Sequence, residues 1–522
     1  MKINKIFALL LTIYSLTSCV GALDQYPHIE ETPETVYTSV DGYKSVLGKI
    51  YVSFVTSGQE QGGGNQDISS NTGYDYMRCY FNLQEAGTDE VACTWLEGEN
   101  IANLTYLSWD ANDQWVSDMY YRIYFTIALC NEFIRNASDE AIANFSEADQ
   151  TQITEFRNEA RFLRALAYYH AMDLYHNIPF VTENDPVGAY APPRYEMAQV
   201  FEYIESELKA IEDNITPVEE QEYGRATQGA VWTLLAKLYL NAEVYTNENR
   251  YSDCISYCNK IINTGSYSLE PDYQKLFNAD NNLRTNEIIF SFPVDAQNTT
   301  SWGATTYIIC GGASSSKDEA YLNSLGLDGG WDNLRLRGNI PKLFNEDDGR
   351  ALFYTEGQSE DVATMTDASN GYLSMKWTNL TDAGEKASDS QAYGVNTDFP
   401  VFRLADVYLM LAESVLRGGT GSNMGTALNL VNKIRERAFG DSHADVTSLT
   451  TDFILDERAR ELLWECTRRT DLIRYGKFTT NSYIWEWKGG TQEGTAVDEK
   501  YNYYPIPSTD LTANPNLSNE DY

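Results

Sequence analysis

The chain is poor in basic residues, and this shortage is the first constraint on what it can bind. Its 522 residues include 38 Lys and Arg against 76 Asp and Glu, so the formal net charge is −38. Nucleic-acid binding depends on cationic side chains that displace counterions, and the composition therefore argues against nucleic acid as a partner. Hydrophobic residues make up 43% of the chain and charged residues 22%, which excludes a disordered or collagen-like protein.

Histidine and cysteine are also scarce, and their spacing offers no metal site. Only four His are present, and His170 and His176 are six residues apart, which places them on different faces of a helix. Of the eight Cys, those beyond Cys19 are odd in number and contain no CxxC pair. We therefore expect no metal and no cofactor, and a fold stabilised by its hydrophobic core rather than by disulfides.

Motifs that carry common catalytic chemistry are absent as well. There is no Gly-x-Ser-x-Gly and no HExxH motif, and Gly62-Gly63-Gly64 lacks the Lys-Ser/Thr of a phosphate-binding loop. The run Glu346-Asp347-Asp348 does not place two carboxylates across a cleft, as a glycosidase needs, and is interpreted as a solvated loop. The sequence thus predicts a protein that is not an enzyme, with a surface glycoside hydrolase as the alternative.

The features that are present begin with a secretory leader. Lys2 and Lys5 precede an apolar segment over residues 6–16, which is too short to cross a bilayer and fits a signal peptide. Leu16-Thr17-Ser18-Cys19 resembles a bacterial lipobox, which predicts removal of residues 1–18 and acylation of Cys19; the alternative is an ordinary signal peptide. Since no other apolar run approaches 18 residues, we expect membrane contact through the lipid anchor only.

A short helical pattern recurs four times along the chain. It consists of Leu, a small residue, and Tyr three residues after the small one, and it starts at Leu47, Leu166, Leu235 and Leu404, with His170 in the Tyr position of the second copy. The pattern is typical of the first helix of a tetratricopeptide hairpin, where the small residue lets a neighbouring helix come close. Apolar spacing predicts second helices over residues 113–133, 197–211, 251–262 and 424–437, and a long helix over 452–475.

Two long gaps interrupt the repeats and are predicted to be insertions. Residues 56–110 are rich in Gly, Asn and Asp, and residues 266–400 combine Gly-rich stretches with short apolar pieces such as Ile288 to Phe292, which predict strands. The expected fold class is mostly α, with helix hairpins and a loop-rich insertion region containing short strands. The expected division is signal peptide 1–18, lipidated tether 19–39, helical repeats 40–265 with the loop insertion 56–110, irregular insertion 266–400, fourth repeat and long helix 401–480, and C-terminal tail 481–522.

Short stretches in a fixed order cover the chain from near residue 19 to residue 522. They are Leu23-Asp24-x-x-Pro27, Glu159 to Ala165, Asn177 to Phe180, Phe402 to Glu413, Asp456 to Leu462, Arg468 to Arg474, Pro505 to Pro507 and Asn514 to Leu517. In this order they resemble the SusD/RagB family of outer-membrane glycan-binding lipoproteins. The match departs at Asn519-Glu520-Asp521-Tyr522, where the family has Gln-Asn-x-Gly-Tyr; the change bears on docking of the tail.

The resemblance implies a fold, a place and a partner. It implies a SusD-like fold on the bacterial cell surface, where the protein serves as the lid of a SusC-like TonB-dependent transporter barrel and delivers oligosaccharides to it. Peptide cargo remains an alternative, and so does a repeat scaffold that binds only proteins.

The resemblance also points to the non-repeat segments for the ligand. A neutral sugar presents an apolar C–H face and a rim of hydroxyls, which suit an aromatic ring and polar side chains. The candidates are Trp95, Asn103 and Tyr106 in the first insertion, and Trp302, Tyr307 and Trp331 in Gly-rich parts of the second, where a loop can present a ring. Any one of these rings could instead pack in the core.

Other aromatic and charged residues are interpreted structurally. Trp109, Trp115 and Trp377 are expected in the core, and the alternation of Tyr74 and Tyr76 favours one face of a strand. The Arg residues between 458 and 474 could bind phosphate or an acidic sugar. They are interpreted instead as a charged helix face, ion-paired at helical spacing with Glu457, Glu461 and Glu465.

Overall fold

The computed structural model describes residues 33–60, 64–520 and 522. The predicted signal peptide, the acylation site Cys19 and the first part of the tether lie outside these residues. Within the described ranges, every helix is too short or too polar to cross a bilayer. The described cysteines beyond Cys19 are all buried and unpaired.

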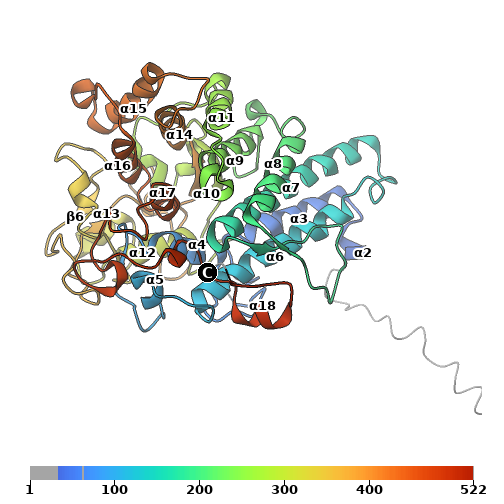
Figure 1. The fold of residues 1–522 in the computed structure, drawn as a ribbon, viewed down its shortest axis with the longest axis horizontal. Helices are drawn as coiled ribbons and strands as arrows, with labels where there is room; N and C mark the ends of the chain where they lie inside the picture. The colour runs from blue at the N-terminus through green and yellow to red at the C-terminus, as the bar shows by residue number, and fades with distance from the viewer. Residues whose placement is uncertain (1–32, 61–63, 521) are drawn as a thin grey trace, which may run out of the picture.

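Long helices follow one another in chain order and form an arc (Figure 1). Contacts join α6 to α7, α7 to α8, α9 to α11, α11 to α14, and α14 to α15. Each pair buries an apolar stripe that neither helix could cover alone. The bounds are α2 Pro33–Val36, α3 Val40–Val52, α6 Gln114–Asn136, α7 Glu147–Tyr175, α8 Met197–Ile211, α9 Gln228–Leu240, α10 Ala242–Thr246, α11 Tyr251–Thr264, α14 Leu404–Leu416 and α15 Met424–Phe439.

The repeated Leu-small-x-x-Tyr pattern lies in α3, α7, α9 and α14. Ala167, Ala236 and Ala405 are completely buried, in keeping with close helix packing at the small position. Gly48 in α3 differs, because a Cβ added there would meet no atom within 4 Å. The second helices predicted over 113–133, 197–211, 251–262 and 424–437 are confirmed as α6, α8, α11 and α15.

Side-chain caps explain where several of these helices begin. Asp113 accepts hydrogen bonds from the backbone N–H groups of Trp115 and Val116 at the start of α6. Asn423 accepts from the N–H of Thr426 at the start of α15, which ends at Gly440 with φ +80°. These groups satisfy backbone donors that the first helical turn leaves unpaired, and glycine adopts the left-handed conformation at little cost.

The irregular part of the chain holds short antiparallel strand pairs and short helices. The pairs are β1 (Ala92–Cys93) with β5 (Leu334–Arg335), β2 (Ile178–Pro179) with β3 (Arg194–Tyr195), β4 (Ile288–Phe292) with β8 (Phe399–Arg403), and β6 (Phe353–Tyr354) with β7 (Leu373–Ser374). The strand predicted over Ile288–Phe292 is confirmed. Because β4 pairs with β8, the ends of the excursion between them meet at its base. The short helices include α12 Ala304–Gly312, α13 Glu319–Leu325 and α18 Ser508–Ala513.

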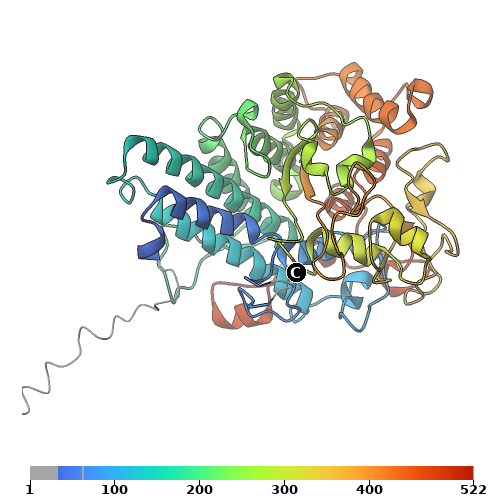
Figure 2. The same ribbon diagram turned by 180° about the vertical axis from the view of Figure 1, so that it is seen from behind.

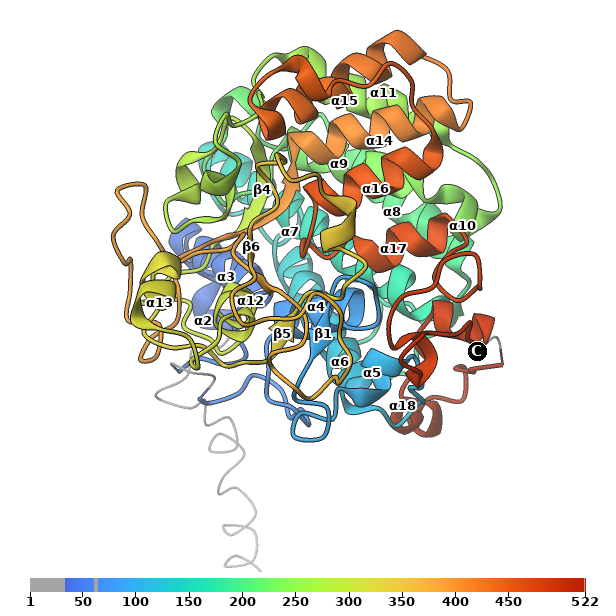
Figure 3. The ribbon, with the colours of Figure 1, turned by 90° about the vertical axis from the view of Figure 1, so that its left-hand side faces the viewer.

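The irregular segments gather on one side of the molecule. Seen from behind, the yellow and light orange chain lies on the side away from α2 and α3 (Figure 2). Figure 3 shows β1 and β5 side by side there, close to α4 (Tyr76–Glu85), α5 (Ala102–Tyr106) and α12. Segments from the two predicted insertions therefore form one region.

The first insertion is more ordered than its composition predicts. Residues 56–110 contain α4, in which all ten residues are buried. The strand predicted from Tyr74 and Tyr76 is wrong: Asp75 between them accepts from the N–H of Arg78 and begins α4. A capping carboxylate together with burial on every face outweighs the local alternation of rings.

The long helix predicted over 452–475 is also wrong. The chain forms α16 (Thr451–Glu461) and α17 (Arg468–Arg474), with left-handed backbone at Trp464 and Cys466 between them. The Trp464 indole is 1% exposed and donates to the Glu90 carbonyl oxygen over 3.1 Å. Burial of this ring outweighs the roughly 1–2 kcal/mol that a left-handed residue costs.

The Arg-rich stretch is not a solvated helix face. Arg460 with Glu457 and Arg474 with Asp471 are at helical spacing, but most partners come from distant elements. Asp348 of the acidic run is likewise buried, against Arg350, so only part of that run is solvated. The long-range ion pairs are Arg458 with Asp406, Arg468 with Asp89, Arg469 with Asp173 and Arg474 with Glu413. Because both partners of each pair are buried, the charges predicted for the surface form internal ion pairs that join distant elements.

A tryptophan cluster as candidate functional site

Strand pairing between the two insertions brings Trp95 and Trp331 together. In the β1–β5 pair, Cys93 lies opposite Leu334, and Thr94 N–H donates to the Asn333 carbonyl oxygen over 3.0 Å. Trp95 follows β1 and Trp331 precedes β5, so antiparallel register places both rings at the same end of the pair. Their ring centroids are 6.2 Å apart at 22°.

Trp302 joins them through the start of α12. The buried Asp75 carboxylate, which begins α4, also accepts from Ser301 Oγ and from the N–H of Ala304. Burial raises the pKa of Asp75, and these hydrogen bonds oppose the rise. A Cβ at Gly303 would lie 1.9 Å from this carboxylate, so only glycine fits the contact. One carboxylate thus connects the two insertions beside the indoles.

The three indoles form a partly exposed group, which we call the tryptophan cluster. Trp331 is central, because Trp302 lies 6.2 Å from it at 58°, on a second ring contact. Trp302 is 38% exposed, and Trp95 and Trp331 are half-buried. The sequence candidates Trp95, Trp302 and Trp331 therefore meet in space. The Trp302 ring is tilted by 58° from Trp331, so the three rings do not share one plane.

Tyr307 lies in a different setting from the one expected. It is in α12 rather than on a loop and is 1% exposed. The prediction that a loop presents this ring to a ligand is therefore wrong. Its ring centroid is 6.4 Å from that of Trp331, and its hydroxyl donates to Asn82 Oδ1 over 2.9 Å. Burial strongly raises the pKa of this hydroxyl, which stays protonated. Tyr307 therefore supports the cluster from beneath.

An arginine that the sequence reasoning missed completes this support. The Arg78 guanidinium lies between two rings, 3.4 Å from the Tyr74 centroid and 4.1 Å from the Tyr307 centroid. Tyr74 in turn stacks on the buried Trp115 at 5.5 Å and 10°. A continuous stack thus runs from the core to Trp331. Such cation–π contacts stabilise by about 2 kcal/mol when they are desolvated.

Arg78 is also bound to the cluster by its polar groups. Its Nη1 donates to the Trp302 carbonyl oxygen over 2.8 Å, and its Nη2 lies 3.4 Å from Glu99. Its Nε and Nη2 have no hydrogen-bond partner among the described residues. Nothing in the sequence marked this arginine, because it lies in a segment predicted to be a loop.

The remaining two candidates make other contacts. Asn103 is exposed on α5 and donates to Asp113 Oδ2 over 3.2 Å. Tyr106 contacts the Trp487 ring, with centroids 6.1 Å apart. Neither has a hydrogen bond or ring contact with the tryptophan cluster among the described residues. The core positions predicted for Trp109, Trp115 and Trp377 are confirmed, at 2% exposure or less.

The chemistry of this surface is that of binding. The partly exposed indoles offer apolar surface, and Glu99 balances the charge of the buried guanidinium behind them. No group of three or more His, Cys, Asp or Glu residues in the described ranges has a geometry that could hold a metal ion.

Comparison with known proteins identifies the family. The protein-family model described as "SusD family" matches residues 353–522, and the family model described as "Starch-binding associating with outer membrane" matches residues 75–240. The "Starch-binding protein SusD" of Bacteroides thetaiotaomicron is 31% identical, over 97% of this chain and 96% of that protein. The "SusD-like protein P25" of Formosa agariphila is 25% identical, over 100% and 99%.

Solved structures agree with this result at the level of the fold. The surface glycan-binding protein A from Bacteroides thetaiotaomicron, in complex with laminarihexaose, superposes with a TM-score of 0.72 at 18% identity, over 93% of this chain and 100% of that one. The architecture is thus that of the mostly helical SusD-like fold. The chain belongs to the SusD family.

Proposed function

We propose that this protein is a cell-surface glycan-binding lipoprotein that captures oligosaccharides and passes them to a TonB-dependent outer-membrane transporter as its lid subunit. The observation that carries the proposal is the tryptophan cluster, three partly exposed indoles in contact on a SusD-family fold. The protein would bind its cargo without changing it. Because the relative SusD is a starch-binding protein, starch fragments are the first cargo to test.

Binding at the cluster would depend on stacking. Indole faces of Trp95, Trp302 and Trp331 would stack on the C–H faces of successive sugars. Arg78 is 2% exposed and its Nη1 donates to the Trp302 carbonyl oxygen, so it would hold the indoles in place rather than contact the sugar. Because Glu99 balances this guanidinium and the chain carries a net charge of −38, a neutral glycan suits the site better than an acidic one.

Placement at the outer membrane has separate support. The lipobox predicts a lipid on Cys19, and one of the matching family models is described as associating with the outer membrane. Two or more acyl chains on one residue give a stable anchor. Affinity purification of the natively acylated protein from its own membranes should recover a TonB-dependent barrel; its absence would refute the lid role.

Isothermal titration against a panel of neutral oligosaccharides tests the binding function. We expect at least one glycan to bind, and Trp331→Ala to weaken it by about tenfold or more, because Trp331 contacts both other indoles. Tyr190→Ala, which removes an exposed ring elsewhere, serves as the matched control. Binding that survives Trp331→Ala, or a panel without any binding, would refute the proposed site.

The same panel separates the alternatives. Chromatography of the glycans after incubation would reveal shortened products if the protein were a hydrolase. Including peptides of mixed sequence in the panel would reveal peptide cargo.

A further inference from the structure

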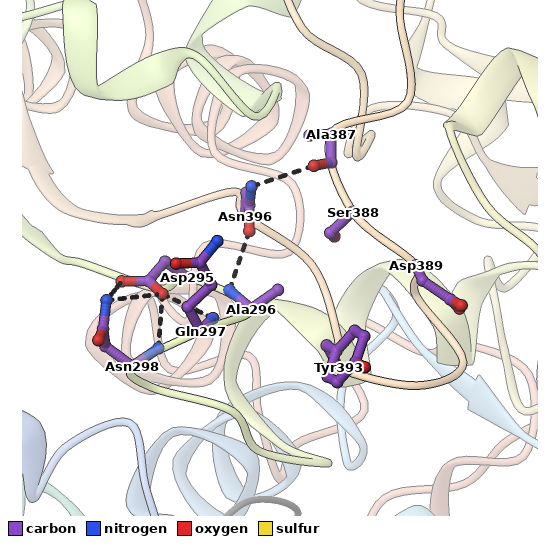
Figure 4. Close-up of a pocket in the computed structure, with 9 residues that line it drawn as sticks. All are labelled: Asp295, Ala296, Gln297, Asn298, Ala387, Ser388, Asp389, Tyr393 and Asn396. Carbon is purple, nitrogen blue, oxygen red and sulfur yellow. Dashed lines mark hydrogen bonds between the residues drawn. The ribbon is translucent and has the colours of Figure 1, made fainter.

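A cavity of about 660 Å³ lies beyond the tryptophan cluster, at the end of the β4–β8 pair. Two segments line it: residues 295–298, which follow β4, and residues 387–396, which precede β8. Figure 4 shows the side chains of both segments around the same space, with Tyr393 and Asp389 on one segment and Asp295 and Asn298 on the other. None of the residues predicted to bind the ligand lines this cavity.

The loop over residues 387–396 is hydrogen-bonded to two of the three segments that carry the cluster, those of Trp331 and Trp302. Gln391 Nε2 donates over 3.3 Å to the carbonyl oxygen of Gly329, which lies two residues before Trp331. Val395 N–H donates over 3.2 Å to Oγ1 of Thr306, which lies four residues after Trp302. The cavity and the tryptophan cluster therefore share a common support.

Tyr393 is the ring that this loop presents. It is 47% exposed. The next residue, Gly394, packs against the neighbour of Trp302, since a Cβ added at Gly394 would lie 3.6 Å from the Ser301 carbonyl oxygen. Tyr393 and Trp302 are thus large exposed rings on adjoining segments.

The polar lining of the cavity suits neutral hydroxyl groups. The Asp295 carboxylate accepts from the N–H groups of Gln297 and Asn298, each over 2.7 Å. Asn396 Oδ1 accepts from the N–H of Ala296 over 2.9 Å, as Figure 4 shows. Among the residues that the structure describes, no Lys or Arg lines the cavity, so they offer an anionic ligand no counter-charge.

We propose that this cavity is a second subsite, at which a starch-type glucan chain that begins on the tryptophan cluster continues past Trp302 and stacks on Tyr393. Sugar hydroxyls then meet the amide and carboxylate groups of residues 295–298. Short chains occupy only the cluster, and longer chains occupy both subsites. This inference rests on the proposed function, because the cluster is the first subsite.

Titration with maltooligosaccharides from maltotriose to maltodecaose tests the subsite. Tyr393→Ala should leave the affinity for maltotriose unchanged and weaken binding of the longest chains by about fivefold, the loss expected for one aromatic contact. Trp331→Ala should weaken every length. Tyr393→Phe keeps the ring and should keep most of the affinity for long chains, and Tyr190→Ala controls for loss of an exposed ring.

The outcomes distinguish this inference from the proposed function. An equal loss at every length would assign Tyr393 to the first subsite, and no loss at any length would remove it from binding; either result overturns the second subsite alone. Binding of another neutral glycan but of no maltooligosaccharide would overturn the glucan assignment. A protein that binds no glycan in the wider panel would refute the proposed function itself.

Discussion

Replacing Glu461 by Gln should destabilise the fold strongly, because three arginines converge on this carboxylate. Arg350 donates over 3.0 Å, Arg403 over 2.6 Å, and Arg437 makes a further short contact. All four side chains are at most 4% exposed. Glutamine keeps the shape but loses the charge and turns an N–H donor toward the guanidinium groups.

The magnitude follows from the partners that remain. Breaking a buried ion pair costs about 3–5 kcal/mol when the other charge is left uncompensated. Here Arg350 retains Asp348, and Arg403 and Arg437 retain Glu287, so the loss should lie near the lower limit, at about 3 kcal/mol. For a cooperative unit of this size, that loss lowers the melting temperature by about 3 °C.

Thermal and urea unfolding at neutral pH measure the effect. The control is Glu202→Gln, the same change at an exposed position of α8, which should shift stability by less than about 0.5 kcal/mol. An E461Q protein as stable as the wild type would refute the argument.

The dependence on pH provides a second test. Burial alone would raise the pKa of Glu461, but Arg437, Arg403 and Arg350 hold it well below its usual range. A carboxylate with a lowered pKa contributes stability above the pKa of the unfolded state, near 4.5, and loses it as the pH falls. The difference between wild type and E461Q should therefore narrow below about pH 4.5; a difference that widens would contradict this assignment.

Three further predictions concern the candidate site and its surroundings. Gly330→Ala should weaken glycan binding in titration, because a Cβ there would lie 2.4 Å from the Ala313 backbone, whereas Gly98→Ala, with nothing within 4 Å, should not. Arg78→Met should weaken binding by about tenfold and change the Trp fluorescence, because the stack beneath the cluster loses its cation; unchanged affinity would contradict the supporting role. Burial raises the pKa of Glu90 from 4.5 to about 8, so the free energy of unfolding should fall as the pH rises from 4.5 to about 8. Glu90→Gln should abolish this part of the pH dependence, as measured by urea unfolding at several pH values in that range.

Local patterns predicted much of the helical part. The stripe of Val200, Ile204 and Leu208 in α8 repeats at three- and four-residue intervals, and the observed helix has the predicted bounds. The same kind of pattern failed at Trp464, where the periodicity of α16 and α17 runs on but the backbone turns. Periodicity indicates which residues can share a helix face. It does not indicate that the Trp464 ring will pack beside Glu90 and interrupt the helix.

The candidate site was predicted in its parts but not in its assembly. The residue types suited to stacking were recognisable in Trp95 of the first insertion and in Trp302 and Trp331 of the second. The contact between Arg78 and Tyr307 beneath these rings has no signal in the local sequence, because the two residues become neighbours only through α4, α12 and the β1–β5 pair. The exposure of Tyr393 has no local signal either.

The amino-acid sequence by itself determined the class of protein. It showed the acidic composition, the lack of common catalytic motifs, the helical hairpins and the family that the ordered stretches resemble. These features are local or additive, so they can be read without coordinates. Only the tertiary structure decided which rings face solvent, which charges are internal and where a ligand could extend. Burial and ion pairing depend on segments hundreds of residues apart, such as Asp89 and Arg468, and only the folded chain brings such segments into contact.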